Sequence, residues 1–419
     1  MWYTTVIINF FTGKMTALKG MNIKVKKYIA ILGFGVVGSG CAEVLAQSKK
    51  LISDRLGFEI EPKYILDLRD FPDSPYADRI VHDYDIILSD PEVELVAEMM
   101  GGSHPALEFS LAAMKAKKSV VTSNKEVVAT HGLELLECAR ENGVKYMFEA
   151  SVGGGIPIIH TIDTSLVQND ITEIDGILNG TTNYILTRMN SAGVAFDDAL
   201  SEAREKGYAE ADPSADIDGI DACRKIAILA ALAFGKLIEP EKIHTEGIRN
   251  LDSTDVKNAA SAGYAIKLIG RTFSDNGRIC AYVCPMLVPA SDPLCTVNDV
   301  FNGIKVNGDA VGEVMLYGRG AGKMPTASAV VADIVNILSG SGVDYSWERA
   351  KDSDILGFEA VSSRHYIRVT GECGCLSGFE KIADGAYITS EMSEADAALL
   401  EKRLEESGVR VEARLRVLG

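Results

Sequence analysis

An acidic loop runs directly into an apolar stretch between residues 207 and 234, and the junction holds the side chains best suited to acid–base chemistry. Asp221 and Lys225 lie one helical turn apart on one face of the expected helix. Residues 226–234 are all apolar, so this helix is expected to be buried on every side. An ammonium group at its mouth needs an acid beside it, because removing the charge from water is costly.

Two interpretations of this pair are open. Asp221 and Lys225 can form an ordinary i,i+4 ion pair. Alternatively, burial and nearby carboxylates prepare Lys225 to exchange a proton with a substrate oxygen while hydride moves at the adjacent carbon. Glu210 and Asp216 would then bind a cationic group. An α-ammonium suits them better than a metal, because the loop has no histidine and no calcium-loop spacing, and Asp212, before Pro213, is interpreted as a turn former.

A glycine-rich turn near the start of the chain predicts dinucleotide binding. The apolar residues 28–32 enter the turn, and a helical stretch follows to about residue 47. Gly33 allows a tight turn, Gly35 lets the backbone approach a pyrophosphate, and Gly38 lets helix and strand pack closely. The alternative is a turn with a purely structural role. The full motif is Gly33-Phe34-Gly35-Val36-Val37-Gly38.

The residues after the second expected strand, at 62–66, would select the coenzyme. Asp67 could accept a hydrogen bond from a ribose 2′-hydroxyl, which would favour NAD, whereas Arg69 could bind a 2′-phosphate, which would favour NADP. The sequence leaves this choice open. Further strands are expected at 86–88, 95–99, 119–122 and 145–148, with helices at 105–115 and 132–142. This alternation predicts an α/β fold with a doubly wound parallel sheet over residues 25–150.

Two strand ends in this sheet carry polar residues. Ligands of open parallel sheets bind beyond the carboxyl ends of strands, so Gly102 and Ser103 on one end and Lys125 on the other are candidates to face the cofactor. For Lys125 the alternative is a solvated surface lysine at a helix start. Beyond them, the glycines of residues 149–157 indicate a hinge or binding loop.

A second domain is expected after this loop, and a small α+β module after that. The second domain has expected strands at 171–178, 281–287 and 310–317 and helices at 181–190, 197–206 and 325–338. The module has expected strands at 366–370, 386–391 and 409–417 and helices at 376–382 and 394–407.

Composition excludes several classes of protein. With 47% hydrophobic and 24% charged residues among 419, the chain is typical of soluble globular proteins. Its net charge of −17 argues against a nucleic-acid partner, and its longest apolar run is too short for a membrane span. Eight scattered cysteines without a Cys-x-x-Cys pair indicate reduced thiols and a cytoplasmic location. Residues 1–24 are expected to be an extension without a signal peptide, with Met15 and Met21 as alternative starts.

Three segments together resemble homoserine dehydrogenase closely. They are Val152-Gly-Gly-Gly-Ile-Pro-Ile-Ile159, Gly176-Ile-Leu-Asn-Gly-Thr-Thr-Asn-Tyr-Ile-Leu186 and residues 207–225. The resemblance extends from about residue 26 to 338 and more loosely to the end. It implies NAD(P)-dependent interconversion of L-homoserine and L-aspartate 4-semialdehyde, in threonine, methionine and isoleucine biosynthesis. It also implies a homodimer or homotetramer built through the middle domain and, since no kinase domain is expected before the glycine turn, the monofunctional form.

The resemblance also implies roles for individual residues. Lys225 would be the proton donor, with Asp221 beside it, and Glu210, with Asp216 as a further candidate, would bind the substrate. Lys125 would lie near nicotinamide and substrate. Gly207 and Gly322, the latter in the Gly320-Ala321-Gly322 turn, match positions that touch the cofactor. A structural sodium ion would be held by the Glu149 side chain and the carbonyls of Val152, Gly154 and Ile156.

The C-terminal module resembles a shortened ACT domain, the unit through which some family members respond to threonine. Residues 371–376 depart from the ACT pattern, and the short span is expected to hold three strands instead of four. Sensing of an amino-acid effector such as threonine and a degenerate module kept for subunit contacts are both open. The expected domains are 25–150 for the dinucleotide, 151–320 for substrate and dimerisation, 321–345 as a returning helix, 346–363 as a linker and 364–419 as the module.

Two other functions remain as alternatives. One is another NAD(P)-linked amino-acid dehydrogenase or semialdehyde reductase, and the other is a nucleotide-sensing or amino-acid-binding regulator without catalysis. The specific match at Asn179 to Asn183 argues against the first, and intact Lys225, Asp221 and Glu210 argue against the second.

Overall fold

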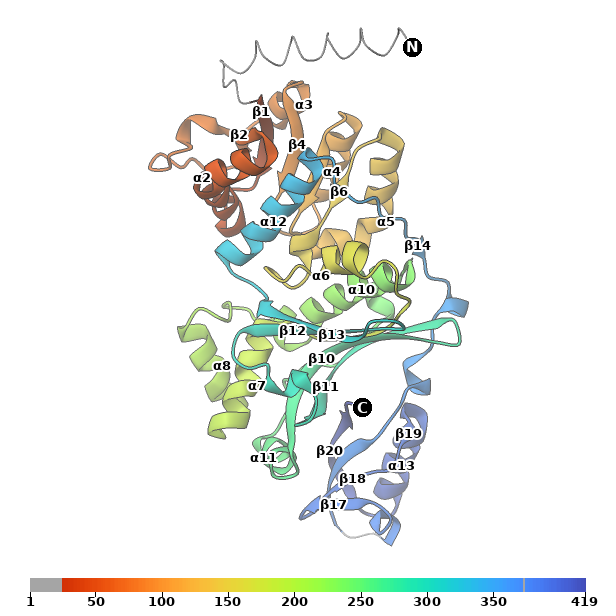
Figure 1. Cartoon of the computed structure of the whole chain (residues 1–419). Coiled ribbons are helices and arrows are strands. Elements are labelled where there is room, and N and C mark those ends of the chain that lie inside the picture. Colours follow the sequence, from red (N-terminus) through yellow and green to blue (C-terminus); the bar gives the residue numbers. More distant parts are fainter. Residues whose placement is uncertain (1–24, 372–373) are drawn as a thin grey trace.

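The computed structural model describes residues 25–371 and 374–419, and three parts of the chain follow one another along the molecule (Figure 1). The dinucleotide-binding part lies at one end, a large sheet lies in the middle, and the C-terminal module lies at the other end. The expectations for residues 1–24 and for Cys373 lie outside the described residues. In the described ranges, no helix combines the length and the hydropathy needed to cross a membrane.

The first part is a parallel sheet, as the sequence predicts. Its order, β3-β2-β1-β4-β5-β6, is that of a doubly wound dinucleotide-binding fold. Residues 29–32 of the central strand are fully buried, because helices cover both faces of a parallel sheet. The strands are β1 (Val25–Leu32), β2 (Phe58–Leu66), β3 (Ile80–Val81), β4 (Val93–Glu98), β5 (Ser119–Thr122) and β6 (Tyr146–Met147). The helices are α2 (Val36–Leu56), α3 (Tyr84–Ser89), α4 (Ala106–Lys115) and α5 (Lys125–Asn142).

The prediction of a strand at residues 86–88 is wrong, because this segment lies in helix α3. Asp83 caps the helix by accepting a hydrogen bond from the Asp85 amide at 2.9 Å, and the burial pattern is helical, with Ile87 buried and Ile86 exposed. The edge strand is instead β3. Helix α5 also begins earlier than expected, at Lys125, because the Asn124 side chain caps it.

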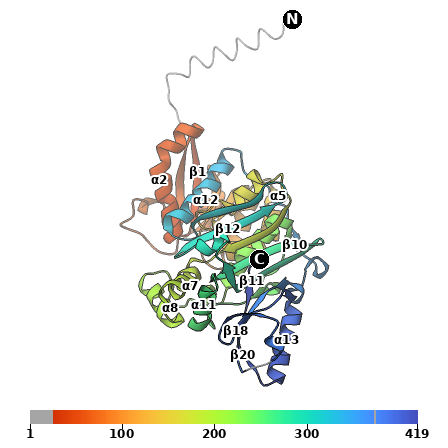
Figure 2. The ribbon, with the colours of Figure 1, turned by 60° about the horizontal axis from the view of Figure 1, so that its bottom comes forward.

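Helix α12 (Lys323–Leu338) returns from the middle of the molecule to the first sheet. It packs against α2 at Gly40, where an added Cβ would lie 3.1 Å from the Cβ of Ala327. Val330 and Ile334 join the same hydrophobic core as Ile29 of β1. Figure 2 shows α2 and α12 together beside β1.

The middle of the molecule is an antiparallel sheet covered on one face by helices. Its strands are β7 (Ile171–Ile177), β10 (Tyr264–Asp275), β11 (Arg278–Pro289), β12 (Phe301–Gly308) and β13 (Gly312–Arg319). Its helices are α6 (Ile158–His160), α7 (Gly180–Ala192), α8 (Phe196–Glu205), α9 (Ser214–Ile217), α10 (Ile220–Phe234) and α11 (Ser253–Ser261). Short strands β8 (Lys236–Leu237), β9 (His244–Thr245) and β14 (Glu348–Arg349) tie connecting segments to this region. The predicted buried helix is α10, whose residues 226–231 are fully buried. The expectation of burial on every side is wrong for its end, because Leu232, Ala233 and Phe234 are only half-buried.

The C-terminal module differs from the prediction in two ways. Its part of the sheet has four strands rather than three, in the order β20-β16-β18-β17. The helix expected at residues 376–382 is wrong, because a turn at 374–376 leads into a strand that forms a hairpin at Gly385, whose φ is +67°. The elements are β15 (Ser362–Ser363), β16 (His365–Thr370), β17 (Glu380–Ala383), β18 (Ala386–Ile388), β19 (Met392–Ser393), α13 (Glu394–Glu406) and β20 (Arg410–Val417).

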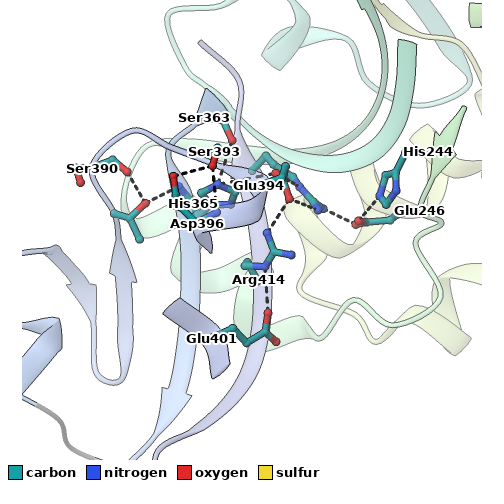
Figure 3. Close-up of polar contacts among 12 residues, drawn as sticks. His244, Glu246, Ser363, His365, Ser390, Ser393, Glu394, Asp396, Glu401 and Arg414 are labelled. Carbon is teal, nitrogen blue, oxygen red and sulfur yellow. Dashed lines mark hydrogen bonds and ion pairs between the residues drawn. The ribbon is translucent and has the colours of Figure 1, made fainter. Parts of the chain in front are cut away.

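The module is continuous with the middle sheet. Strand β20 pairs in parallel with β11, so that Arg416 lies opposite Met286. A charged network holds the junction together. The buried Arg416 donates to Glu394 at 2.8 and 2.9 Å and pairs with Glu246, which lies on the middle part of the chain. Arg414 donates to Glu394 as well, at 2.8 Å (Figure 3).

Candidate active site

A buried carboxylate between two lysines lies where the first sheet meets α10. Asp221 accepts from the Lys225 ammonium at 2.7 Å, and its other oxygen lies 3.1 Å from the Lys125 Nζ. Asp221 and Lys225 are 5% and 8% exposed. The i,i+4 pair therefore forms, but it is buried and shares its acid with a lysine from α5, which an ordinary surface pair would not do.

The position of Lys225 is fixed by two hydrogen bonds. Its Nζ donates to Asp221 and, at 2.7 Å, to the carbonyl of Leu178 at the end of β7. A lysine ammonium has three N–H donors. One donor of Lys225 therefore remains for a substrate oxygen.

Asn179 connects this pair to the acidic loop. Its Nδ2 donates to Asp221 at 2.8 Å and to Asp216 at 2.7 Å, while its Oδ1 caps α7 by accepting from the Thr182 amide at 2.9 Å. Asn179 is not among the site residues predicted from the sequence. Its position just before a predicted helix was the signal that could have identified it as a cap.

The charges of the cluster shift the pKa values of its acids in opposite directions. Burial disfavours ionisation of Asp221, but the charges of Lys225 and Lys125 outweigh it, so that the pKa of Asp221 lies well below its usual range. Burial, and then the charge of Asp221, raises the pKa of Asp216. The charge of Asp221 raises the pKa of Lys125. The site thus holds one firmly anionic acid between cations.

Glu210 and Gly207, two of the predicted site residues in the acidic segment, lie outside this cluster. Glu210 is exposed, and within residues 25–371 and 374–419 it makes no hydrogen bond or ion pair. Gly207 is exposed as well and has a φ of +72°. Their roles in binding substrate and cofactor therefore stay predictions.

The glycine turn has the geometry that the sequence predicts. Gly33 has a φ of +85°, and its amide donates to the Leu66 carbonyl at 2.8 Å. A Cβ on Gly38 would lie 1.9 Å from the Gly33 carbonyl oxygen, whereas a Cβ on Gly35 would meet nothing within 4 Å. The turn is therefore closed on the protein side and open at the helix start, where a pyrophosphate would lie. Val36 and Val37 follow at the start of α2.

Asp67 and Arg69 contact each other at the end of β2. Arg69 donates to both oxygens of Asp67, at 2.9 and 3.0 Å, and the Phe34 amide donates to Asp67 at 2.7 Å. The Arg69 side chain holds the pKa of Asp67 at about 2. The guanidinium is exposed and lies 5.1 Å from the centre of the Phe71 ring. The acid is thus charge-neutralised, and the cation faces solvent.

The two predicted strand ends meet beside the turn. Asn124 donates to the Gly102 carbonyl at 2.7 Å, and the Ser103 hydroxyl donates to Glu126 at 3.0 Å. Glu126 also pairs with Arg224 of α10, which precedes Lys225. The strand ends of the first sheet are therefore tied to the helix that carries the lysine.

The residues expected to hold a cation lie in the glycine-rich segment at residues 149–157. The Glu149 carboxylate is buried, accepts from the amides of Ile159 and His160 at 3.0 and 2.6 Å, and has its pKa raised to about 7 by burial. Val152 and Ile156 are buried, and the Ile156 carbonyl accepts from Ile158 at 2.8 Å. Gly154 packs against the turn that contains Gly322, since its Cβ would lie 2.5 Å from the Gly320 carbonyl carbon.

Fold and site together define an oxidoreductase of the NAD(P)-binding class, with a lysine and carboxylate at the junction of the dinucleotide-binding sheet and a second domain. Residues 33–149 match a family model described as "Homoserine dehydrogenase, NAD binding domain", and residues 157–335 match one described as "Homoserine dehydrogenase". The chain belongs to the homoserine dehydrogenase family.

Individual relatives agree with this assignment. A homoserine dehydrogenase of Synechocystis sp. is 45% identical over 82% of this chain and 79% of its own length. One of Lactococcus lactis is 39% identical over 89% and 84%. The crystal structure of a homoserine dehydrogenase from Thiobacillus denitrificans superposes with a TM-score of 0.88 at 34% identity, covering 94% of this chain and 98% of that one.

A hyperthermophilic archaeal homoserine dehydrogenase mutant, solved in complex with NADPH, is also similar. It has a TM-score of 0.64 at 31% identity and covers 75% of this chain and 98% of its own. The activity of the family is the NAD(P)-dependent interconversion of L-aspartate 4-semialdehyde and L-homoserine, which belongs to the biosynthesis of threonine, methionine and isoleucine.

Proposed function

We propose that Lys225 donates the proton in this reaction and that Asp221 holds it in place. The supporting observation is that two of the three ammonium donors are occupied, by Asp221 and by the Leu178 carbonyl, in a buried position. A fixed ammonium with one remaining donor is suited to protonate an oxygen at a defined point.

The chemical step then needs one proton from the protein. The bound coenzyme supplies hydride to the aldehyde carbon of L-aspartate 4-semialdehyde. As the C=O π bond breaks, the oxygen takes a proton from Lys225, and the amine formed is reprotonated from solvent. In the reverse direction, neutral Lys225 accepts the hydroxyl proton of homoserine. Lys125, on the other side of Asp221, would contact the substrate, and its positive charge keeps Asp221 ionised.

Substrate binding is assigned to the acidic loop. Asp216, held by Asn179, would accept from the α-ammonium of the substrate, and Glu210 would join it. Gly207 on this loop, Gly102 and Ser103 at the strand end, and Gly322 would contact the coenzyme.

The experiment is Lys225→Met, which removes the charge and keeps the length of the chain. We expect kcat for reduction of aspartate semialdehyde with NADPH to fall by about 10²–10⁴, while the Kd of NADPH changes little. Retained turnover would contradict the assignment. The same assay tests the regulator alternative, since a protein without catalysis would show no turnover before the substitution either.

We propose that either NADP or NAD can bind at the end of β2. Arg69 neutralises Asp67 and presents an exposed guanidinium, so we propose that it binds the 2′-phosphate of NADP. NAD would use the same turn without this contact.

We also propose that a sodium ion is held by Glu149 and the carbonyls of Val152, Gly154 and Ile156. The support is the buried carboxylate and the carbonyls of Val152 and Gly154, which accept no hydrogen bond from the described residues. Hard oxygen ligands suit such an ion, whose role would be to neutralise Glu149 at the hinge.

The assembly and the C-terminal module complete the proposal. We propose a cytoplasmic homodimer or homotetramer in which residues 151–320 form the subunit contact, residues 25–150 and 321–345 bind the coenzyme, and residues 346–363 link to the module at 364–419. Glu246 contacts the module, and three residues later Arg249 pairs with Asp218 of the acidic loop. An effector such as threonine bound to the module would thus have a route to the substrate loop. Inhibition by threonine, and light scattering for mass, test these points.

A further inference from the structure

We propose that Glu98, the last residue of β4, is a positioning residue. It would fix the position of the loop at residues 99–103, proposed to contact the coenzyme, and the position of Lys125 at the start of α5. This inference rests on the proposed roles of Gly102, Ser103 and Lys125. Glu98 is fully buried at the carboxyl edge of the first sheet. Among residues 25–371 and 374–419 it forms no ion pair, so no salt bridge offsets the burial of its charge.

The carboxylate of Glu98 holds the loop that follows its own strand. Its Oε1 accepts from the Met100 amide at 2.6 Å. Residues 99 and 100 in turn lie against the glycine turn, because a Cβ on Gly33 would be 2.9 Å from the Met99 carbonyl oxygen and 3.1 Å from Met100 Cγ. Glu98 therefore fixes the loop that packs on the pyrophosphate turn.

The other carboxylate oxygen holds the neighbouring strand end. Glu98 Oε2 accepts from the Thr122 hydroxyl at 2.5 Å, and that hydroxyl accepts from the Asn124 amide at 2.9 Å. Asn124 donates to the Gly102 carbonyl at 2.7 Å and caps α5, whose first residue is Lys125. A single carboxylate is thus connected to both strand ends that would meet the nicotinamide.

An anionic carboxylate accepts from both donors at once. In an amide or a protonated acid one of the two atoms becomes a donor, so the Thr122 hydroxyl would have to accept from residue 98 and would lose the hydrogen bond that it donates there. The titratable groups that face Glu98 are the phenols of Tyr84 and Tyr146. Burial raises the pKa of Glu98 to about 7, against the hydrogen bonds from Thr122 and Met100, which lower it. Burying this charge costs free energy. We attribute the presence of an acid here to its role in positioning the two strand ends at the proposed coenzyme site.

The opposite edge of the same two strands provides a matched control. Lys118, directly before β5, is buried and donates to the carbonyls of Asp90 and Val93, the latter at the start of β4. It holds β4 and β5 together as Glu98 does, but at the amino edge, away from the proposed coenzyme site. Lys118→Met should lower Tm and leave coenzyme binding unchanged.

The experiment compares Glu98→Gln, Thr122→Val, Thr122→Ser and Lys118→Met at 25 °C, with the Kd of NADPH measured by fluorescence and kcat by turnover. Glu98→Gln is expected to raise the Kd and to lower kcat by at least about tenfold each. Thr122→Val keeps the Met100 contact, so kcat should fall more than binding weakens, and Thr122→Ser should restore it.

Wild-type constants in folded Glu98→Gln, or equal losses in Lys118→Met, would overturn the proposal. If Glu98→Gln does not fold, the two Thr122 variants test the proposal. An equal fall in kcat in Thr122→Val and Thr122→Ser, or no fall in either, would overturn the proposal. The NADPH measurement does not depend on proton donation. Retained turnover in Lys225→Met would therefore remove the assigned role of Lys225 without changing the outcome for Glu98.

Discussion

The side-chain amide of Asn179 donates to Asp216 and Asp221 at once, at 2.7 and 2.8 Å, and so joins the acidic loop to the lysine-bearing helix. Two carboxylates so close together would repel each other without a shared donor. The same side chain caps α7 through its oxygen. One residue therefore supports both helix stability and the geometry of the acids, and these two functions can be separated.

Asn179→Ser should keep the cap, since serine caps as well as asparagine, and should lose the donor to both acids. We expect Tm to fall in this variant, because Asp216 and Asp221 then repel each other. The KM for the amino-acid substrate should rise and kcat should fall, together by roughly 10-fold to 100-fold in kcat/KM, because hydrogen bonds to charged groups are lost. Steady-state kinetics and thermal unfolding measure the two effects. Asn179→Ala should show the same kinetic loss and a stability about 1 kcal/mol lower than that of Asn179→Ser; equal stability in both variants would contradict the cap.

Arg69→Ala tests coenzyme selection. The exposed guanidinium pairs with Asp67, and removing it leaves an anionic acid at the place of the 2′-phosphate. We expect KM for NADPH to rise by at least about tenfold, from the loss of a charge-assisted contact, while KM for NADH stays similar or falls. The ratio of kcat/KM for the two coenzymes is the readout. Equal losses with both would show that Arg69 only shapes the turn.

Arg416→Met tests how the module is fastened. The side chain is 3% exposed and pairs with Glu394 and Glu246, so the substitution removes the shared cation and leaves Glu394 with Arg414 alone. Because Arg414 remains, we expect a loss of about 1–3 kcal/mol, as for hydrogen bonds to charged groups, measured as a lower midpoint in urea unfolding. The exposed pair of Lys50 with Asp54 is the control, and Lys50→Ala should leave the midpoint unchanged. An unchanged midpoint in Arg416→Met would mean that the junction does not need this network.

Local patterns allowed the first sheet, its glycine turn and the pair of Asp221 and Lys225 to be predicted from sequence. They depend on a strand entering a turn, and on two side chains one helical turn apart. The error at residues 86–88 arose because three consecutive apolar residues fit a strand and a short helix equally well, and the cap at Asp83 decides between them. Likewise, β17 depends on a hairpin at Gly385 rather than on its own apolar pattern.

Contacts between distant segments could not be predicted in the same way. The sequence left two interpretations of Lys125, a solvated surface lysine and a site residue. Only the packing of α5 against α10 brings its Nζ to 3.1 Å from an Asp221 oxygen. In the sequence Glu98 lies within the apolar strand expected at residues 95–99, and no role was predicted for it. Its proposed role depends on the hydrogen bond from Thr122, which lies on the neighbouring strand.

The final prediction concerns sodium and pH at Glu149. Burial raises the pKa of its carboxyl from 4.5 to about 7. An acid whose folded pKa is raised contributes stability below its unfolded pKa, and this stability is lost as the pH rises through about 7. A bound cation would offset the loss, so at pH 8 NaCl should raise Tm above its value in equal KCl, and at pH 5 the two salts should act alike. Glu149→Gln should remove the difference. Asp163→Asn should keep it, because Asp163 is a nearby, half-buried acid whose pKa is also raised to about 7 but which is not a proposed ligand. A sodium response that persists in Glu149→Gln would place the ion elsewhere.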